Sequence, residues 1–444
     1  MNAPQSPPPC PTPRWAVPRA RASAEAGPLW KLGCAAVPRA RAGAHRIALL
    51  LVLLAWRAAS SPAFARTVTV HILGARPPHA LALSSEAGGR VRVGMRVDVW
   101  RAGVPLRLCA CAPRSIVVRF GDAPPEQATA VTVVAPVMTC GGRRYTGAIT
   151  ARCPDGATLF LVNRTPLEDY VGGVVTSEAL PGTPLQALRA QAVAARSFAV
   201  ASAHLLTAQR GRPRGPHAEE GFDFCDLTHC QSFRGLGRGA ALQAARDTRG
   251  LVLWSEGRVV AAWYHSTCGG RTAAPREAGA DPALRSVPDV APSGRAWCAD
   301  SPHFRWHVDL GVARVRDALN RDPSTRVGRH LRTLRVTRRY PDGRVARIEL
   351  RGSRVRQVSG QAFWMVLGRE LGWGNVESAW FYVHRCGRVF EFDGRGLGHG
   401  CGMCQYGAAA MARAGYHWRA ILAHYYPGTT VRPLPPPSPE GART

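Results

Sequence analysis

Residues 176–199 read T-S-E-A-L-P-G-T-P-L-Q-A-L-R-A-Q-A-V-A-A-R-S-F-A, and this stretch predicts a tight turn followed by an alanine-rich helix. Thr183 stands at the N-cap position, Pro184 at the first helical position and Gln186 at the third, which together form the pattern of a capping box. Apolar residues then recur three or four positions apart toward Leu205. The many alanines would let another backbone approach this helix closely.

Glu178 is the candidate proton donor of this stretch. It lies between apolar neighbours just before the turn at Pro181 and Gly182. Partial desolvation there would raise the pKa of its carboxyl group and suit it to general acid catalysis. The same pattern also fits a surface glutamate near the start of a helix, where the helix dipole favours a negative charge. The local residues leave both interpretations open.

The sequence on either side of this helix predicts an α+β fold. Period-two alternation of apolar residues, broken by Gly and Pro, runs from Thr67 to about Leu161 and predicts a β-rich N-terminal domain over residues 66–144. We expect a mixed α/β domain over residues 145–431 and a disordered Pro-rich tail over 432–444. Within the mixed domain a strand-like block is expected at 250–265, and further helices at 359–371, 406–414 and 417–425.

Residues 1–65 have the features of a secretory signal peptide with an upstream extension. Arg41 and Arg46 precede an apolar run at 47–56, and Ala63-Phe64-Ala65 forms a small-x-small cleavage signal. The apolar run is shorter than the ~20 residues that a spanning helix needs. We therefore expect an exported protein of the periplasm or cell envelope. An uncleaved membrane anchor is the alternative interpretation.

The charge of the chain indicates an acidic partner. There are 58 Lys and Arg against 29 Asp and Glu, for a formal net charge of +29 at pH 7. A strongly basic exported protein favours polyanions, such as nucleic acid or the polymers of the cell wall. The sequence has no helix-turn-helix signal, zinc-finger spacing or concentrated aromatic and basic stripe, so we expect no nucleic-acid partner.

The segment C-D-L-T-H-C-Q, over residues 225–231, groups two cysteines and a histidine. Cys225, His229 and Cys230 are good zinc ligands, and His217 lies just upstream to complete a set of four. A disulfide between the two cysteines is equally compatible with an exported protein. Of the 13 cysteines, two precede the expected cleavage site. The odd number that remains leaves at least one thiol unpaired or bound to a metal.

Two glycine-rich segments each hold a histidine among small residues. They read Y-H-S-T-C-G-G-R-T over residues 264–272 and G-L-G-H-G-C-G-M-C-Q-Y-G over residues 396–407. Such glycine density indicates a close approach of the backbone or positive φ angles. No Gly-Lys-Ser/Thr follows, which argues against a phosphate-binding loop. His265 and His399 suit hydrogen bonding to a substrate in a cleft, and two tight structural turns are the alternative.

Six blocks, taken in this order, resemble the SpoIID/LytB family, which comprises stage II sporulation protein D and the amidase enhancers. They are residues 163–182, 188–199, 225–231, 264–272, 396–408 and 424–428. The resemblance extends from about Tyr145 to Thr429 and implies a SpoIID-like catalytic domain. It also implies a peptidoglycan lytic transglycosylase that acts on glycan strands whose stem peptides an amidase has removed.

The resemblance implies that Glu178 is the catalytic residue. A lytic transglycosylase needs one acid/base, which protonates the leaving glycosidic oxygen and then deprotonates the C6 hydroxyl of muramic acid. The reaction yields 1,6-anhydro-muramic ends and activates no water nucleophile. It therefore does not need the pair of carboxylates that glycosidases use. The matching blocks contain the candidate substrate-binding residues Gln191, Arg196, His265, Ser266, Arg271, His399, Gln405 and Tyr406.

The resemblance further implies a structural Zn²⁺ site around Cys225 and Cys230 with a nearby histidine, whereas the proposed chemistry itself requires no cofactor. Cys268 and Cys298 are plausible disulfide partners by likeness to similar proteins. Cys401 and Cys404 stand where the family usually has a hydrophobic residue and a serine. This Cys-x-x-Cys pair is expected to form a disulfide or an additional metal site.

The expected partners are peptidoglycan glycan strands and an N-acetylmuramoyl-L-alanine amidase. A non-catalytic amidase enhancer or glycan-binding module, in which Glu178 only positions sugar, is an alternative. A zinc hydrolase that uses Cys225, His229 and Cys230 is a third possibility. The enhancer reading predicts that an amidase is stimulated equally well after Glu178→Ala.

Overall fold

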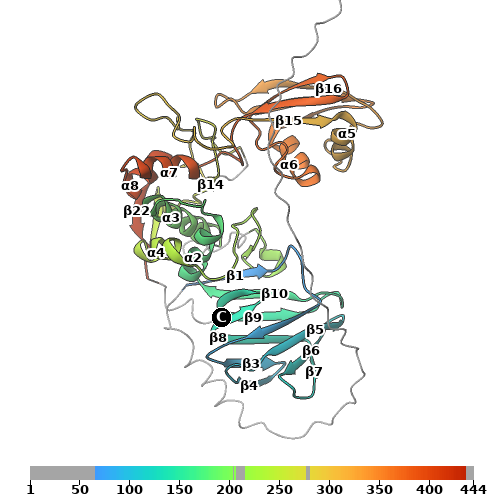
Figure 1. The fold of residues 1–444 in the computed structure, drawn as a ribbon, viewed down its shortest axis with the longest axis vertical. Coiled ribbons are helices and arrows are strands. Elements are labelled where there is room, and N and C mark those ends of the chain that lie inside the picture. Colours follow the sequence, from blue (N-terminus) through green and yellow to red (C-terminus); the bar gives the residue numbers. More distant parts are fainter. Residues whose placement is uncertain (1–65, 204, 207–215, 277–280, 437–444) are drawn as a thin grey trace, which may run out of the picture. The chain divides into compact units, whose positions relative to one another are not determined.

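The structure is a computed structural model, and it describes residues 66–203, 205–206, 216–276 and 281–436 (Figure 1). The expected signal peptide and most of the expected Pro-rich tail lie outside the described residues. The described part holds seven α-helices and strands in five sheets, which confirms the α+β expectation. None of its helices is both long and apolar enough to cross a membrane.

The N-terminal strands form one large, mainly antiparallel sheet in the order β11-β1-β10-β9-β8-β2-β5-β6-β7, with β3 and β4 attached through β8. The predicted alternation places every second residue of β1 in the core, namely Val68, Val70 and Ile72. The strands are β1 (Thr67–Ile72), β2 (Ala80–Ser84), β3 (Gly89–Val93), β4 (Arg96–Trp100), β5 (Leu106–Ala112), β6 (Ser115–Phe120), β7 (Glu126–Ala128), β8 (Ala130–Cys140), β9 (Arg143–Arg152), β10 (Phe160–Pro166) and β11 (Phe224–Cys225).

This sheet and the helices that follow it share one hydrophobic core. The expected boundary between residues 144 and 145 falls inside β9, and β10 continues the same sheet up to the first residue of α2 (Leu167–Glu178). Buried residues of the sheet, such as Val70, belong to the same cluster as Val171 and Val174 of α2. Glu178 is therefore carried by a helix that is packed directly against the large sheet.

The alanine-rich helix α3 (Leu185–Ser202) confirms the predicted helix, but the prediction that a capping box begins it is wrong. Pro184 is the N-cap, and no side chain caps the helix. The Thr183 hydroxyl instead donates to the Leu180 carbonyl oxygen at 2.7 Å and closes the turn. The buried alanines let α3 pack against α2, α4 (Gly239–Asp247), α7 (Gln405–Arg413) and α8 (Trp418–Tyr425) (Figure 1).

Two adjacent glycines explain how a loop lies directly over α2. A Cβ atom on Gly173 would lie 2.1 Å from the Gly235 carbonyl oxygen, and one on Gly237 would lie 2.6 Å from the Gly172 carbonyl. Only residues without side chains permit this approach. The hydroxyls of Thr176 and Ser177 then accept hydrogen bonds from N–H groups of the same loop.

The remaining strands and helices form smaller units. The expected strand block at 250–265 comprises β12 (Leu251–Ser255), β13 (Arg258–Val259) and β14 (Tyr264–His265). The three later helices are confirmed as α6, α7 and α8. A separate core, which includes Phe363, Phe381 and Phe392, joins two three-stranded sheets to α5 and α6. Their elements are β15 (Trp306–Gly311), α5 (Val312–Asn320), β16 (Leu331–Arg339), β17 (Val345–Gly352), β18 (Val355–Val358), α6 (Gly360–Leu371), β19 (Phe381–Cys386) and β20 (Val389–Gly394).

Candidate active site

Glu178 is the last residue of α2, and its carboxylate is half-buried and hydrogen-bonded on both oxygens. Oε1 accepts a hydrogen bond from the Ser232 backbone N–H at 2.6 Å, and Oε2 accepts one from the Tyr264 hydroxyl. The interpretation of Glu178 as a surface residue near a helix start is therefore wrong. It lies at the opposite end of a helix, where the dipole disfavours a negative charge.

The environment of Glu178 tunes its acidity. Burial raises the pKa of the carboxyl group to about 7, and the hydrogen bonds from Tyr264 and Ser232 act in the opposite direction without cancelling this effect. A carboxyl group with a pKa near neutrality is present in both its acid and its base form at neutral pH. It can therefore donate a proton and then accept one.

A chain of side chains orients the Tyr264 hydroxyl toward Glu178. Gln231 donates from Nε2 to the Tyr264 oxygen at 3.1 Å, and its Oε1 accepts a hydrogen bond from the Tyr170 hydroxyl at 3.2 Å. Because the Tyr264 oxygen already accepts a hydrogen bond from Gln231, its own proton is free to point at Glu178. Tyr170, Gln231, Ser232 and Tyr264 were not predicted as site residues, although Gln231 and Tyr264 lie at the ends of two segments that the sequence singled out.

The two glycine-rich segments meet beside Glu178. β14 pairs in parallel with β21 (Met403–Cys404), so that Tyr264 lies opposite Met403 and His265 opposite Cys404. One residue further along, Gln405 donates from Nε2 to the backbone carbonyl of Glu178 at 3.0 Å. The side chain of the predicted site residue Gln405 thus contacts the main chain of Glu178.

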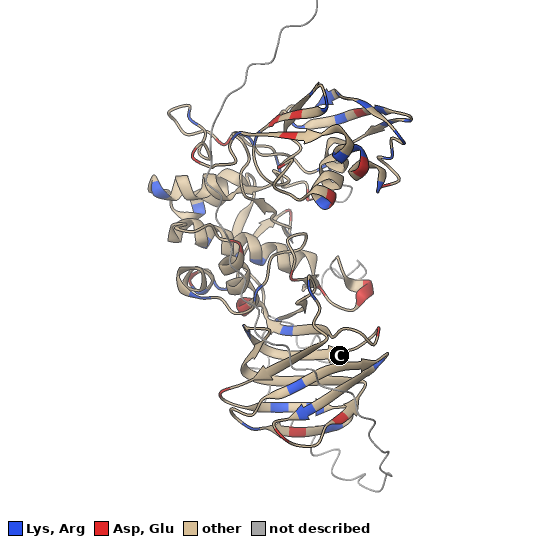
Figure 2. Ribbon diagram, turned by 45° about the vertical axis from the view of Figure 1, so that its right-hand side comes forward, with Lys and Arg blue, Asp and Glu red and all other residues tan. Residues whose placement is uncertain are grey.

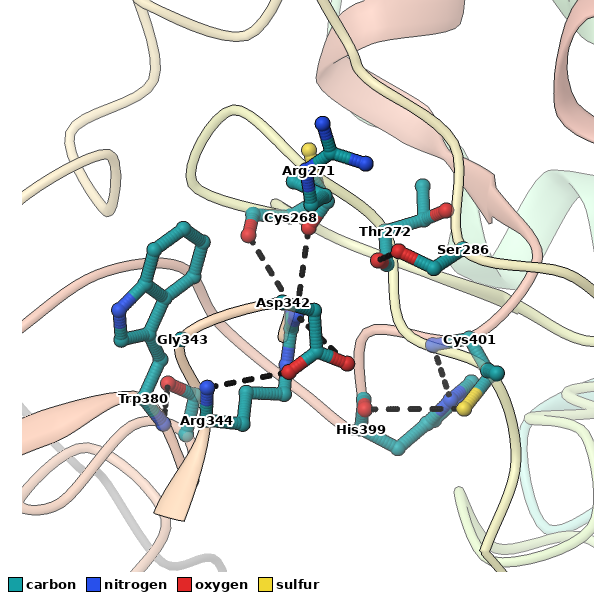
Figure 3. Close-up of polar contacts among 12 residues, drawn as sticks. Cys268, Arg271, Thr272, Ser286, Asp342, Gly343, Arg344, Trp380, His399 and Cys401 are labelled. Atoms are coloured by element: carbon teal, nitrogen blue, oxygen red, sulfur yellow. Dashed lines mark hydrogen bonds and ion pairs between the residues drawn. The ribbon is translucent and has the colours of Figure 1, made fainter. Parts of the chain in front are cut away.

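His399 is neutral and acts on the backbone of Tyr264. Its Nδ1 accepts a hydrogen bond from the Cys401 N–H at 3.1 Å (Figure 3), so the ring proton is on Nε2 and is donated to the Tyr264 carbonyl at 2.9 Å. Burial lowers the pKa of His399 to about 4. With both ring nitrogens engaged, His399 positions Tyr264 in this structure.

Four further predicted residues lie in the same two segments. His265 is buried, with Nδ1 3.1 Å from the Cys401 carbonyl oxygen, while its Nε2 has no hydrogen-bond partner among the described residues. The backbone N–H of Tyr406 donates to the Ser266 carbonyl at 3.2 Å. The carbonyl oxygen of Arg271 accepts a hydrogen bond from Arg344, a residue that the sequence did not suggest (Figure 3).

Arg196 and Gln191 lie inside the protein, away from any substrate surface. Arg196 has no exposed area, and its guanidinium pairs with Glu168 at 2.7 Å. It also donates to the backbone carbonyls of Ala192, Ala245 and Leu251. These contacts use its donors to join α2, α3, α4 and β12, which corrects its expected role as a substrate ligand. Gln191 is similarly buried, and its Nε2 has no hydrogen-bond partner in the described part of the chain.

The four expected zinc ligands converge. The ligand atoms of His217, Cys225, His229 and Cys230 all lie within 4.8 Å of one another. The Nε2 atoms of the two histidines are 3.0 Å apart, and Cys225 Sγ lies 3.2 Å from His229 Nε2. Two thiols and two imidazoles at these separations fit a tetrahedral zinc ion. Glu220 accepts from Nδ1 of His217 at 3.0 Å, as outer partners of metal-bound histidines do.

The cysteine pairs expected as disulfides are arranged differently. No disulfide is formed among the described residues, and the Sγ atoms of Cys268 and Cys298 lie 3.5 Å apart. Cys404 does not group with Cys401; its sulfur lies with those of Cys268 and Cys298. The glycine-rich segment of residues 396–407 therefore contributes one cysteine to a buried cluster and leaves the other outside it.

These features define an α+β protein with one tuned carboxylate at the end of a buried helix, and comparisons identify its relatives. Residues 155–254 match the family model described as stage II sporulation protein, SpoIID, and residues 296–402 match a domain of unknown function (DUF8618). The first match covers α2, α3 and the loop of the four candidate zinc ligands. The second covers β15 to β20 and the segment that leads to His399.

Curated relatives agree with the first match. Stage II sporulation protein D of Bacillus subtilis is 29% identical over 284 residues, which span 61% of this chain and 75% of that protein. An uncharacterised protein of Brachyspira hyodysenteriae is 28% identical over 300 residues, or 66% of this chain and 74% of its own. The amidase enhancer of Bacillus subtilis is 25% identical over 303 residues, 58% of this chain and 40% of that protein. The chain is therefore similar to members of the SpoIID/LytB family, among them a stage II sporulation protein D and an amidase enhancer.

Proposed function

We propose that this protein is an exported lytic transglycosylase that cleaves the glycan backbone of peptidoglycan strands from which the stem peptides have been removed. The observation that carries the proposal is the single carboxylate of Glu178, whose pKa is raised to about 7 by burial. Among the described residues, no second carboxylate contributes to this shift or is hydrogen-bonded to Glu178. A one-carboxylate site suits a reaction that consumes no water.

In the proposed reaction the protonated Glu178 gives its proton to the glycosidic oxygen, and the bond between that oxygen and C1 of the muramic residue breaks. The resulting carboxylate takes the proton of the C6 hydroxyl of the same residue. O6 then bonds to C1, which gives a 1,6-anhydro-muramic end and returns Glu178 to its acid form. The donors Tyr264 and Ser232 stabilise the carboxylate between the two proton transfers.

The charge of the chain supports an acidic glycan as the substrate. Each muramic acid without its stem peptide exposes a lactyl carboxylate, so a denuded strand is a polyanion, and a basic protein attracts it. Figure 2 shows Lys and Arg on strands of the large sheet and on strands in the C-terminal half of the chain, rather than in one continuous stripe. His265, Ser266, Arg271 and Tyr406 remain the proposed contacts with the sugar.

An amidase that prepares such strands is the proposed partner, and the periplasm or cell envelope is the proposed location. We assign the zinc to His217, Cys225, His229 and Cys230 in a structural role. The loop that these residues close leads directly to Gln231 and Ser232, which contact Tyr264 and Glu178. Zinc there would order the loop, while every proton transfer is left to Glu178.

The experiment is to incubate the purified full-length protein with amidase-stripped glycan strands and to identify the products by mass spectrometry. Anhydro products, lighter than hydrolytic products by one water, are expected. Hydrolytic products would contradict the transglycosylase reaction. Absence of cleavage by folded, zinc-loaded protein would favour the alternative of an amidase enhancer, a name that one relative carries.

A further inference from the structure

A second cluster of metal-binding side chains lies away from the loop of His217 and Cys225. The thiols of Cys268, Cys298 and Cys404 meet the carboxylate of Asp289, and all four ligand atoms lie within 4.8 Å of one another. All four residues are buried, and Asp289 and Cys404 have no exposed area. Cys268 Sγ lies 3.5 Å from Cys298 Sγ and 3.0 Å from Asp289 Oδ2.

These separations are close to those of ligands around one zinc ion. Zinc–sulfur bonds of about 2.3 Å in a tetrahedron place two sulfurs roughly 3.8 Å apart, and an oxygen ligand lies somewhat nearer to each sulfur. Small shifts of the side chains would therefore admit the ion. The donor set of three cysteines and one carboxylate is soft and anionic, which favours zinc over calcium or magnesium.

The backbone around the cluster is arranged to stabilise thiolates. The Cys268 N–H donates to Cys404 Sγ at 3.3 Å, the Gly270 N–H to Cys268 Sγ at 3.3 Å and the Gly407 N–H to Cys404 Sγ at 3.4 Å. Cys404 is also the N-cap of the nine-residue helix α7, where the helix dipole favours a negative charge. Backbone donors of this kind favour the ionised form of a sulfur that a metal binds.

The carboxylate of Asp289 is oriented by an outer partner. Its Oδ1 accepts a hydrogen bond from the Tyr425 hydroxyl at 2.6 Å, which leaves Oδ2 directed at the sulfurs. Among the described residues, no Lys or Arg forms an ion pair with Asp289, and the nearest basic group is His424 at 3.9 Å. A fully buried carboxylate without a close cation is costly unless a metal or a proton neutralises it. The hydrogen bond from Tyr425 is typical of second-shell support for a metal ligand.

We propose that Cys268, Cys298, Cys404 and Asp289 form a second, structural zinc site. Binding displaces the thiol protons, and the ion reduces the charge of three thiolates and one carboxylate to −2. Arg344, which is buried and donates to the Cys268 carbonyl oxygen at 3.0 Å (Figure 3), lies close enough to offset part of the remaining charge.

The site would connect two segments that are far apart in the sequence. Cys268 follows Tyr264 in one glycine-rich segment, and Cys404 directly precedes Gln405 in the other. Tyr264 and Gln405 both contact Glu178, so the ion would fix the segments that position the proposed catalytic carboxylate. The ion would bind here whichever reaction Glu178 performs.

A disulfide between Cys268 and Cys298 is the competing state. It would require an oxidant to remove two electrons and two protons, and it would leave the thiol of Cys404 and the carboxylate of Asp289 buried without a metal. Two measurements on the full-length protein separate the states. These are the zinc content per chain by elemental mass spectrometry, and a peptide map of alkylated cysteines prepared without reductant after denaturation in chelator.

We expect wild-type protein to hold two zinc ions, and Cys298→Ser to lose one of them. The matched control is Cys401→Ser, which changes a buried cysteine of the same region that is not a ligand and should leave the content at two. The peptide map should show Cys268, Cys298 and Cys404 alkylated. A Cys268–Cys298 crosslink in the map, or an unchanged zinc content in Cys298→Ser, would overturn the proposal.

A second route avoids variants of the buried cluster, which can fail to fold. Cys225→Ser combined with Cys230→Ser removes the thiols of the first site only. After exchange with cobalt, this protein should still show a thiolate-to-cobalt charge-transfer band of one cobalt per chain. Absence of that band in the folded double variant would contradict the second site.

Discussion

The Tyr264 hydroxyl donates its hydrogen bond to Oε2 of Glu178, although 86 residues separate the two in the sequence. The phenol oxygen accepts from Gln231, so its proton has one direction in which to point. The hydrogen bond from Tyr264 to Glu178 therefore becomes stronger when the carboxyl group loses its proton. Burial raises the pKa of Glu178, and the hydrogen bond from Tyr264 lowers it.

Tyr264→Phe is expected to shift the pH dependence of glycan cleavage upward. Because the hydrogen bond from Tyr264 lowers the pKa of Glu178, its loss raises that pKa. Loss of a hydrogen bond to a charged group should raise the pKa of Glu178 by roughly one unit. The measurement is kcat/KM against pH, with the decline at high pH moving up and the maximal rate falling. Tyr382→Phe, an exposed tyrosine on β19, is the control, and an identical profile in Tyr264→Phe would exclude this role.

Glu178→Gln is expected to make the protein more stable at pH 8 than the wild type. The folded-state pKa of Glu178 is raised from 4.5 to about 7, so the folded state holds this proton more tightly than the unfolded state. That contribution is fully present below pH 4.5 and is lost as the pH rises through about 7. The glutamine variant has no such loss, and the gain at pH 8 should be roughly 1–3 kcal/mol.

Urea unfolding at pH 4 and pH 8 measures this difference. The gain of Glu178→Gln over wild type should be small at pH 4 and larger at pH 8. Glu86→Gln, which changes an exposed glutamate in the turn between β2 and β3, should show no comparable dependence. An equal gain at both pH values would mean that Glu178 does not titrate near neutrality in the folded protein.

Arg196→Met is expected to destabilise the fold by about 3 kcal/mol, because it removes the ion pair with Glu168 and three hydrogen bonds to backbone carbonyls. Arg189→Met is the matched control in the same helix. Arg189 pairs with Asp247 at a partly exposed position, where such a pair contributes at most about 1 kcal/mol. Equal unfolding free energies for the two variants would contradict the structural role of Arg196.

Removal of zinc from the loop of residues 217–230 is expected to lower the melting temperature and to impair cleavage together. Cys225→Ser removes one of the four proposed ligands, so the loop that carries Ser232 toward Glu178 should lose the metal that is proposed to anchor it. Zinc content, melting temperature and cleavage rate are measured on one preparation. A variant without zinc that kept full activity would show that the order of this loop does not affect the function of Glu178.

Much of the fold was predictable from local patterns. The period-two alternation of β1 and the three later helices depend on neighbouring residues, and the sequence carries that information directly. The predicted capping box was wrong because the Thr183 hydroxyl donates to the Leu180 carbonyl oxygen and closes the turn instead of capping the helix. α2 was missed because Gly172 and Gly173 are weak helix formers, and they are present for the loop that lies on the helix.

The candidate site was predictable only in part. Glu178 and the zinc ligands stand in compact segments, so the sequence could single them out. Tyr170 and Ser232 reach the site only through the packing of α2 against the loop, a relationship between distant segments that no local pattern encodes. Arg196 was assigned to the substrate because arginine suits anionic glycans, whereas its burial and its pairing with Glu168 depend on tertiary structure.

The central claim is that Glu178 transfers the proton in glycan cleavage. The most direct test compares wild type, Glu178→Gln and Glu86→Gln on amidase-stripped strands, with anhydro products quantified by mass spectrometry and folding checked by thermal melting. Glu178→Gln should remain folded and lose activity by at least about 10²-fold, while Glu86→Gln retains the wild-type rate. Anhydro products formed by Glu178→Gln at the wild-type rate would contradict the claim.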